Sequence, residues 1–481
     1  MKRAVLVLVD GLRPDVAESA LARGELPALA ALTATGSVTR GVTVFPSTTS
    51  VAYLPFLTGC TPGHCNIPSI RWLERTRYAG DWWRERELVR SYCGYQAGRL
   101  DGDITPTVRT IFDLVPESLG IFTPVARGLT PARDPARTER QFWGALAHVA
   151  EWHQPADNAA RRHLLRGIDQ GWRFIFAQFP AVDGYTHQST PDGPKVLRAL
   201  RQVDATLGEM RARLQARGEL EDTLIVMVSD HGASTVRHHL DLADWFRAQG
   251  VRTMSHPVIW ERQPAAAVMV AGNGSAMVYA RPGVQRTARS SLTDLRSHTG
   301  FGVTHDVIKA LVREEAVAFV AAEERPGEVR VADAMGEALI TQETGGRIRY
   351  HRCGGDPLAI GGDVTQTPDA GLETTWDGPY PDACVQLLDQ FAAQRTGDLL
   401  VVGREGHDFR RRFEVPEHKA GHGSLIRAHM QVPIWSNLPM PAGPLRTVDL
   451  FPAMLHWLGE PIPDDIDGQS RWQPGSTIAV A

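Results

Sequence analysis

Three strongly apolar segments of this 481-residue chain are followed by acidic residues or histidines, and this pattern limits the possible folds. The segments are Ala4–Val9, Arg173–Phe179 and Thr223–Val228, and they are apolar at most positions instead of at alternate positions. Continuous apolar strands are buried on both faces, which is typical of a parallel sheet covered by helices. Residues Val16–Leu32 and Lys195–Arg217 have the apolar spacing of such helices. The sequence therefore predicts an α/β fold with a mostly parallel central sheet and helices on both faces.

The middle of the chain differs in composition from its two ends. Residues 240–415 hold many glycines and prolines between short apolar runs, and the Asn-Gly pair in AAAVMVAGNGSAMVYA predicts a β-hairpin. After this region, the strand-like MQVPIWSN and the helical Asp449–Leu458 return to the earlier pattern. We therefore predict one core formed by residues 1–239 and 416–481, with residues 240–415 inserted as a cap. A second insertion is expected at about residues 71–105.

Charge and hydropathy exclude several kinds of partner. The net charge is −4 and the isoelectric point is about 6.5, so we expect neither a nucleic-acid polymer nor a membrane as partner. No segment approaches the roughly 18 apolar residues of a membrane span, and Ala4–Val9 is too short for a signal peptide. These observations predict a soluble, cytoplasmic protein. The five cysteines have no Cys-x-x-Cys spacing, which argues against a disulfide framework and against a cysteine-built zinc site.

Residue types that commonly bind metal ions follow the three buried segments. The carboxyl ends of parallel strands meet at one edge of a sheet, where ligands gather. Six such side chains follow the strands or lie in the glycine-rich AGHGS, and they are Asp10, Asp183, His187, Asp230, His231 and His422. Each motif alone is more typical of a helix cap, a surface ion pair or a loop. Together, three carboxylates and three imidazoles make up two three-ligand sets, which suit Zn²⁺ or Mn²⁺.

The hydroxyl-rich stretch FPSTTSVAYLPFLTG (Phe45–Gly59) is a candidate source of a nucleophile. It has the pattern of a loop that opens a helix, and the N-terminus of a helix favours a bound phosphate. The alternative is that Ser47, Thr48 or Thr49 only caps the helix.

Together these motifs resemble the alkaline phosphatase superfamily, and they are most similar to its type I phosphodiesterase and nucleotide pyrophosphatase branch. In that family the nucleophile stands nine residues before a Thr-Gly pair, at the head of a helix. Counting back from Thr58 identifies Thr49 as the expected nucleophile, with Thr48 as the alternative. The tail DLFPAMLHWLGEPIPDDIDGQS also resembles the family's closing helix and its Asp-Gly-x-Ser loop.

The resemblance also implies how the ligands are divided between two divalent ions, which we expect to be Zn²⁺, with Mn²⁺ as the alternative. One ion would be held by Asp10, Asp230, His231 and Thr49 itself. The other would be held by Asp183, His187 and His422. His422 is preferred over the neighbouring His418 and His429 because its glycine neighbours match the family motif.

Two departures from the pyrophosphatase branch concern the substrate. Residues Ser50–Ala52 follow Thr49 where that branch has Phe-Pro-Asn, and Ile70 stands near the place of an Asn that holds a phosphate oxygen. Asn66 and Arg71 are the candidate substrate-binding substitutes, so nucleotide specificity is not implied. The stretch also lacks the Cys-x-Pro-x-Arg type of motif found in sulfatases, which excludes sulfatase activity.

The resemblance implies a metal-dependent hydrolase that cleaves phosphodiester or pyrophosphate bonds of a small-molecule phosphoester through a phosphothreonine intermediate. Two alternatives stay open. One is phosphonate or phosphomonoester hydrolysis on the same two-metal site, and the other is a non-catalytic binding protein that has kept the fold. The oligomeric state does not follow from the sequence.

Overall fold

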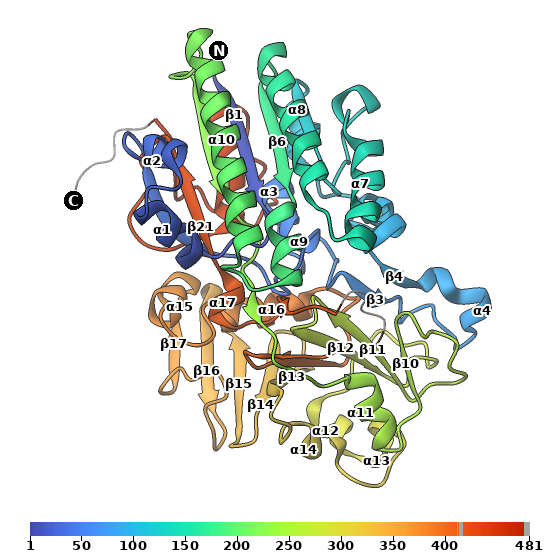
Figure 1. The fold of residues 1–481 in the computed structure, drawn as a ribbon. Helices are drawn as coiled ribbons and strands as arrows, with labels where there is room; N and C mark the ends of the chain where they lie inside the picture. Colours follow the sequence, from blue (N-terminus) through green and yellow to red (C-terminus); the bar gives the residue numbers. More distant parts are fainter. Residues whose placement is uncertain (411, 413–416, 476–481) are drawn as a thin grey trace.

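The computed structural model describes residues 1–410, 412 and 417–475, and it contains two large β-sheets, one below the other in Figure 1. The first sheet takes its strands from both ends of the chain. Its order is β22 (Leu445–Arg446), β2 (Ser37–Val42), β21 (Gln431–Ser436), β7 (Thr223–Val228), β1 (Arg3–Val9), β6 (Phe174–Phe179) and β5 (Ser118–Ile121). The predicted α/β class is confirmed, and the three predicted buried segments form the neighbouring strands β7, β1 and β6.

The part of the first sheet that carries the predicted ligands is parallel. β6 and β7 lie on either side of β1, with Val9 opposite Phe179 and Leu8 opposite Val228, so all three strands end at the same edge. β5 extends this parallel block beyond β6. β21 runs antiparallel to both β7 and β2, because the chain enters it from that same edge. The sheet is therefore mixed, and the sequence did not predict that β21 runs antiparallel to its neighbours.

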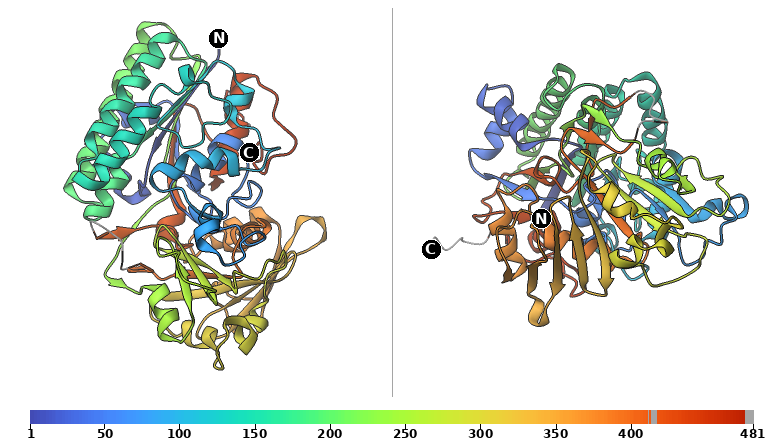
Figure 2. Two further views of the ribbon diagram at one scale, coloured as in Figure 1. Left: turned by 90° about the vertical axis from the view of Figure 1, so that its right-hand side faces the viewer. Right: turned by 90° about the horizontal axis from the view of Figure 1, so that it is seen from below.

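Helices cover both faces of the first sheet, which explains the continuous apolar pattern of β1. The flanking helices are α3 (Leu54–Thr58), α8 (Gln154–Gln170), α10 (Pro194–Ala216) and α18 (Leu450–Leu458). Val5 and Val7 of β1 belong to the hydrophobic cluster that contains residues of α8 and α10, whereas Leu6 belongs to the cluster of α3 and α18. In the left view of Figure 2, α8 and α10 stand on one side of the sheet and α18 on the other.

The predicted helix Val16–Leu32 is in fact two helices, α1 (Pro14–Ala22) and α2 (Pro27–Thr33). Gly24 has a φ of 73°, which ends the first helix, and Pro27 stands at the first position of the second. The apolar spacing continues across the break, so it did not show the interruption.

The second sheet comes from the middle of the chain. Its order is β10 (Thr253–Ser255), β11 (Ala266–Ala271), β12 (Ser275–Ala280), β18 (Leu399–Gly403), β13 (Val317–Arg325), β14 (Glu328–Ala332), β15 (Glu337–Gln342), β16 (Ile348–Arg352) and β17 (Val364–Gln366). The predicted hairpin is confirmed, since β11 and β12 pair antiparallel around the Asn-Gly turn. All of these strands lie between residues 240 and 415, but the predicted boundary after residue 415 lies outside the described residues.

The remaining elements are mostly short. The other α-helices are α4 (Trp82–Glu85), α5 (Leu100–Asp103), α6 (Ile111–Leu114), α7 (Arg137–Ala150), α9 (Ala181–Gln188), α11 (Leu242–Ala248), α12 (Leu292–Arg296), α13 (His298–Phe301), α14 (Val307–Leu311), α15 (Pro368–Thr375), α16 (Ala383–Ala392) and α17 (Arg427–Met430). The small strands pair as β3 (Arg71–Leu73) with β4 (Val89–Ser91), β8 (Ser234–Thr235) with β20 (Ala420–Gly421), and β9 (His238–His239) with β19 (His407–Asp408). The 3₁₀-helix η1 (Val51–Tyr53) precedes α3.

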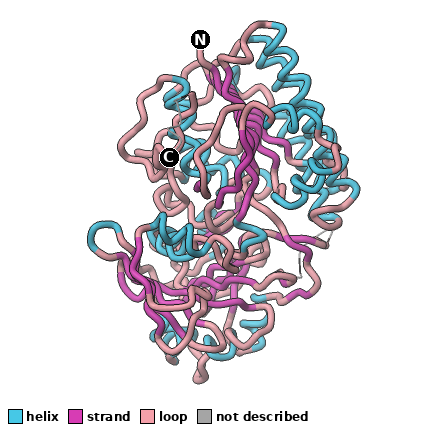
Figure 3. The backbone as a smooth tube through the Cα atoms, turned by 90° about the vertical axis from the view of Figure 1, so that its left-hand side faces the viewer, coloured by secondary structure: helices cyan, strands magenta, loops and turns pink. Residues whose placement is uncertain are grey.

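The two sheets share one hydrophobic cluster, which includes Leu6 of β1, Met269 of β11 and Phe319 of β13. Within the expected second insertion, the Leu73 backbone N–H donates to the Tyr279 hydroxyl at 3.2 Å, so this segment is attached to the second sheet. Figure 3 shows the strands of both sheets in magenta, with loops between the two sets. Among the described residues, no helix has the length and apolar character that crossing a membrane would require.

Candidate active site

The predicted metal ligands lie at the carboxyl ends of three neighbouring strands. Asp10 follows β1, Asp230 and His231 follow β7, and Asp183 lies in α9, which begins just after β6. Gly11 has a φ of 70°, and a β-carbon there would lie 2.7 Å from Asp183 Oδ1, so this close approach requires glycine. The Gly11 backbone N–H also donates to Asp230 Oδ1 at 3.1 Å. The turn after β1 therefore holds the three carboxylates together.

One set of ligands is formed by Asp10, Asp230 and His231, all of them buried. Their ligand atoms lie within 4.8 Å of one another. His231 Nε2 is 3.3 Å from Asp230 Oδ2 and 3.5 Å from Asp10 Oδ1. Three protein ligands around one position are the usual number in a catalytic zinc site.

A second group of ligand atoms within 4.8 Å of one another contains Asp183, His422 and again His231, and the predicted ligand His187 lies beside Asp183. The four-residue spacing within α9 brings His187 Nε2 to 3.2 Å from Asp183 Oδ2. His422 Nε2 is 4.0 Å from Asp183 Oδ1. The rings of His422 and His231 stack with 3.9 Å between their centroids, so the two sets form one continuous site.

A backbone carbonyl lies at hydrogen-bond distance from Nδ1 of each of the three imidazoles, and for His231 it is the Gly232 carbonyl oxygen at 3.1 Å. His187 Nδ1 is 2.8 Å from the carbonyl oxygen of Ala420, and His422 Nδ1 is 3.0 Å from the carbonyl oxygen of Ser47. Because a carbonyl oxygen can only accept, Nδ1 carries the proton in the neutral form of each ring, and this form has on Nε2 the lone pair that a metal ion needs.

The buried carboxylates of the site perturb one another. Burial, followed by the charges of the other two carboxylates, raises the pKa of Asp10 well above its ordinary value. Burial raises the pKa of Asp230 to about 8. Burial acts in the same direction on Asp183, but the neighbouring imidazoles, His187 first, outweigh it and lower the pKa of Asp183. Burial also lowers the pKa of the His422 imidazole, which favours the neutral form that binds metals.

The donor set fits divalent metal ions. Asp183 Oδ1 and Asp230 Oδ2 are buried and have no hydrogen-bond partner among the described residues. Buried polar atoms are nearly always partnered, so two unpartnered carboxylate oxygens in one site indicate a place for cations. Two such ions would also offset the repulsion among three buried carboxylates.

The Thr49 hydroxyl lies against the first ligand set. Its Oγ1 is 3.1 Å from His231 Nε2 and 3.3 Å from Asp10 Oδ1. The next residue, Ser50, has a φ of 74°, and η1 begins directly after it, so a tight turn presents the hydroxyl. Thr48 differs, because its buried Oγ1 has no hydrogen-bond partner among the described residues. Thr49, unlike Thr48, therefore has its hydroxyl in contact with two predicted metal ligands.

The two residues predicted to bind substrate make other contacts. Asn66 Oδ1 accepts a hydrogen bond from the Arg395 backbone N–H at 3.2 Å. Arg71 donates to the carbonyl oxygen of Val270 at 3.0 Å and to Cys93 Sγ at 3.2 Å. No hydrogen bond within the described part of the chain joins Asn66 or Arg71 to the predicted metal ligands. Their role in substrate binding stays a prediction.

Two residues that orient Asp10 were not predicted. Gln178 Nε2 donates to Asp10 Oδ2 at 2.7 Å, and the Tyr53 hydroxyl donates to the same oxygen at 2.9 Å. Gln178 could have been noticed, because it is the polar residue inside the otherwise apolar strand FIFAQF. The role of Tyr53 could not have been predicted in this way, because a tyrosine in an apolar helical segment is typical of the hydrophobic core.

The turn between β11 and β12 reaches the site from the second sheet. Asn273 forms a backbone bridge with His422, and the Gly274 N–H donates to the His422 carbonyl oxygen at 2.8 Å. A β-carbon on Gly272 would lie 2.7 Å from His422 Nδ1. The turn therefore supports a predicted metal ligand. The sequence predicted the hairpin but not this contact.

The fold is shared with solved structures of low sequence identity. Phosphonoacetate hydrolase from Sinorhizobium meliloti 1021, in complex with phosphonoacetate, matches with a TM-score of 0.56 and 15% identity, over 95% of this chain and 96% of that chain. Inactive murine ectonucleotide pyrophosphatase / phosphodiesterase 5, in complex with AMP, matches with a TM-score of 0.55 and 12% identity, over 98% of both chains. Human ectonucleotide pyrophosphatase / phosphodiesterase 5 matches with a TM-score of 0.57 and 13% identity, over 99% of this chain and 100% of that chain. These likenesses define an alkaline phosphatase-like α/β fold.

Sequence comparison gives the family. No curated protein sequence matches the chain significantly. The family model for type I phosphodiesterase / nucleotide pyrophosphatase, however, matches residues 4–425. The chain therefore belongs to this family, and the resemblance found in its motifs is confirmed.

Removal of one imidazole tests the second ligand set. We expect His187→Ala to lower the divalent metal retained after zinc loading by about one ion per chain, because a site of three protein ligands would lose one of them. The measurement is metal analysis of the desalted protein by mass spectrometry. His407→Ala, a change in β19 outside both sets, is the control and should retain as much metal as the wild type. An unchanged metal content in His187→Ala would contradict the assignment.

Asp157 of α8 supports the start of α9, which carries two of the ligands. Asp157 Oδ1 accepts from the Ala181 backbone N–H at 3.0 Å, while Oδ2 is buried without a partner among the described residues. Burial raises the pKa of Asp157 from its ordinary 3.8 to about 8. The folded protein therefore binds this proton more tightly than the unfolded chain does. The stabilising contribution is present below about pH 4 and is lost as the pH rises through about 8.

We expect Asp157→Asn, which stays uncharged, to match the wild type in free energy of unfolding near pH 4 and to exceed it near pH 8. Urea unfolding at both pH values measures the difference. Asp192→Asn, at an exposed position, should show no such pH-dependent gain. A difference between Asp157→Asn and the wild type that is the same at both pH values would refute the prediction.

Proposed function

We propose that the protein is a metal-dependent phosphoric ester hydrolase that cleaves phosphodiester or pyrophosphate bonds of small molecules, with Thr49 as its nucleophile. Membership of the type I phosphodiesterase / nucleotide pyrophosphatase family supports phosphoester hydrolysis. The observation that carries the proposal is the position of Thr49 Oγ1, 3.1 Å from His231 Nε2 and 3.3 Å from Asp10 Oδ1. A hydroxyl that touches two candidate metal ligands is placed where metal coordination can activate it.

The residues present fit two ions, for which we propose Zn²⁺, with Mn²⁺ as the alternative. One ion would be held by Asp10, Asp230, His231 and Thr49. The other would be held by Asp183, His187 and His422. Bound there, the ions would supply Lewis acidity that lowers the pKa of a hydroxyl and stabilises charge on phosphate oxygens.

The reaction then consists of two displacements at phosphorus. Thr49 Oγ1 gives up its proton to solvent water and attacks, so that an Oγ1–P bond forms while the bond from phosphorus to the leaving oxygen breaks. The leaving oxygen takes up a proton and departs. Water then attacks the phosphothreonine, the Oγ1–P bond breaks, and the Thr49 hydroxyl is restored. Two in-line displacements give net retention of configuration at phosphorus.

We further propose that residues 1–239 and 416–481 carry this chemistry, while residues 240–415 shape the substrate pocket. The contact between the Gly272–Gly274 turn and His422 supports this division of roles. Arg71 donates to the carbonyl oxygen of Val270, just before this turn, and is the candidate for binding a charged substituent of the substrate.

The test compares hydrolysis of bis-p-nitrophenyl phosphate with that of p-nitrophenyl phosphate by the zinc-loaded protein. We expect a preference for the diester, and we expect Thr49→Ala to lower kcat by about 10³-fold or more while the bound metal changes little. Thr48→Ala is the matched control, since it removes the same side chain one residue away, and it should keep most of the activity.

The other outcomes select among the alternatives. A preference for the monoester would assign the protein to the phosphomonoesterases. Turnover by Thr49→Ala close to that of the wild type would exclude Thr49 as the nucleophile. Metal-loaded protein with no Thr49-dependent activity on either ester would favour phosphonate hydrolysis or a non-catalytic binding function.

A further inference from the structure

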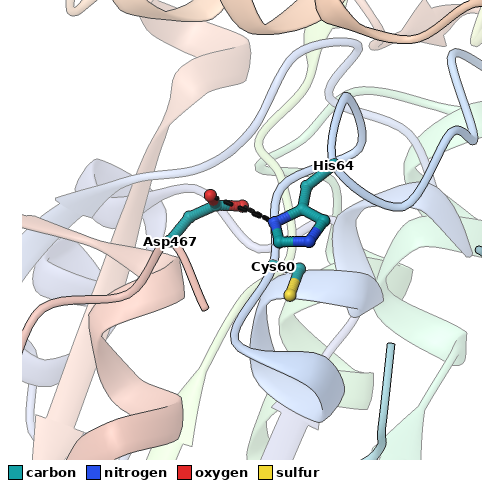
Figure 4. A group of neighbouring side chains, drawn as sticks. All are labelled: Cys60, His64 and Asp467. Carbon is teal, nitrogen blue, oxygen red and sulfur yellow. Dashed lines mark hydrogen bonds and ion pairs between the residues drawn. The ribbon is translucent and has the colours of Figure 1, made fainter. Parts of the chain in front are cut away.

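A third cluster of metal-binding residue types lies outside the site described above. It consists of Cys60, His64 and Asp467, whose ligand atoms all lie within 4.8 Å of one another. Figure 4 shows Asp467 and His64 facing each other, with Cys60 next to the imidazole ring. Cys60 and His64 belong to the loop after α3, whereas Asp467 follows α18 and is 403 positions from His64. The cluster therefore joins two distant parts of the chain.

The distances in the cluster suit a small tetrahedral ion. His64 Nδ1 is 3.1 Å from Asp467 Oδ2 and 3.2 Å from Oδ1. Ordinary zinc bond lengths in a tetrahedron separate a nitrogen from an oxygen ligand by about 3.3 Å, and a sulfur from either by about 3.6 Å. The imidazole and the carboxylate thus already have nearly this spacing. Cys60 Sγ lies within 4.8 Å of a ligand atom of each of the other two residues.

The loop around the cluster holds Asp467 in position. The Thr61 backbone N–H and hydroxyl donate to Asp467 Oδ2 at 2.8 and 2.9 Å. The backbone N–H groups of Asp467 and Gly468 donate to the Gly59 carbonyl oxygen at 2.9 and 3.0 Å. Within the described residues, Asp467 Oδ1 has a hydrogen-bond contact with His64 alone, so this oxygen keeps a lone pair for a cation. A ligand set that is held in place before binding favours metal affinity.

The structure assigns Cys60, His64 and Asp467 as a further zinc site, separate from the two sets of the proposed active site. A thiolate, an imidazole and a carboxylate together favour Zn²⁺ over Mg²⁺ and Ca²⁺, which prefer oxygen ligands alone. The ion would fasten the far end of α3, the helix that follows Thr49, to the segment after α18. Cysteine spacing alone did not predict this site, because the carboxylate comes from the other end of the sequence.

The alternative is a metal-free chain of thiolate, imidazolium and carboxylate. In such a chain, hydrogen bonds from Cys65 and then from His64 would hold the pKa of the Cys60 thiol at about 6. The hydrogen bond to Asp467 would raise the pKa of His64 to about 10. The two arrangements differ in one observable property, because only the zinc site forms a bond between sulfur and a metal.

Cobalt substitution distinguishes the two arrangements. Co²⁺ bound to a thiolate absorbs in the near ultraviolet through sulfur-to-metal charge transfer, whereas carboxylate and imidazole ligands give no such band. The ligands of the proposed active site contain no sulfur, so a band from the Co²⁺-loaded full-length protein would report on a cysteine. We expect this band in the wild type, and we expect Cys60→Ser to lose both the band and about one metal ion per chain.

Three further variants complete the experiment. His64→Gln changes a partly exposed residue, is less disruptive to the core, and should weaken or abolish the band in the same way. Cys353→Ser removes an exposed thiol and should keep the band, as should Thr49→Ala. Wild-type protein without the band, or a band that persists in Cys60→Ser, would overturn the proposal. The readout does not depend on turnover, so it stands or falls separately from the proposed phosphoester hydrolysis.

Discussion

The mutual repulsion of Asp10, Asp183 and Asp230 is the constraint on which the rest of the structure depends. The parallel register of β1 with β6 and β7 brings the three strands to one edge, so the carboxylates cannot separate without a change of register. Burial strengthens the repulsion, because the low-polarity interior screens charge poorly. The surrounding imidazoles, and the divalent ions that the site fits, are the compensation that such an arrangement requires.

Neutral hydrogen-bond donors decide which carboxylate oxygen is available for this compensation. Gln178 and Tyr53 both donate to Asp10 Oδ2, whereas Thr49 and His231 lie near Asp10 Oδ1. The carboxylate is therefore fixed by one oxygen and presents the other to the site. Partners behind a ligand commonly set its orientation in this way. Thr49, the proposed nucleophile, and the predicted ligand His231 thus both lie near the same oxygen of Asp10.

The sequence predicted those parts of the fold and site that depend on local pattern. Continuous apolar runs predicted the central strands. The four-residue spacing of Asp183 and His187 predicted that the two side chains lie close together on one helix, which is α9. His422 stands 191 positions after His231, so the sequence connected it with the site only through its glycine-rich loop before a strand and through the family resemblance. The reversal of β21, the roles of Gln178 and Tyr53, and the contact of the β11–β12 turn with His422 depend on packing between distant segments. No local periodicity encodes such contacts.

The backbone bridge between Asn273 and His422 has a consequence for how this protein can diversify. Strands β14 to β17 form the outer edge of the second sheet, far along its order from β11 and β12, so insertions and sequence drift there can alter the molecular surface while leaving the ligands in place. A single added residue in the Gly272–Gly274 turn would instead displace the His422 imidazole from the proposed metal site. Libraries intended to change substrate range should therefore vary the outer strands and keep the length of this turn constant.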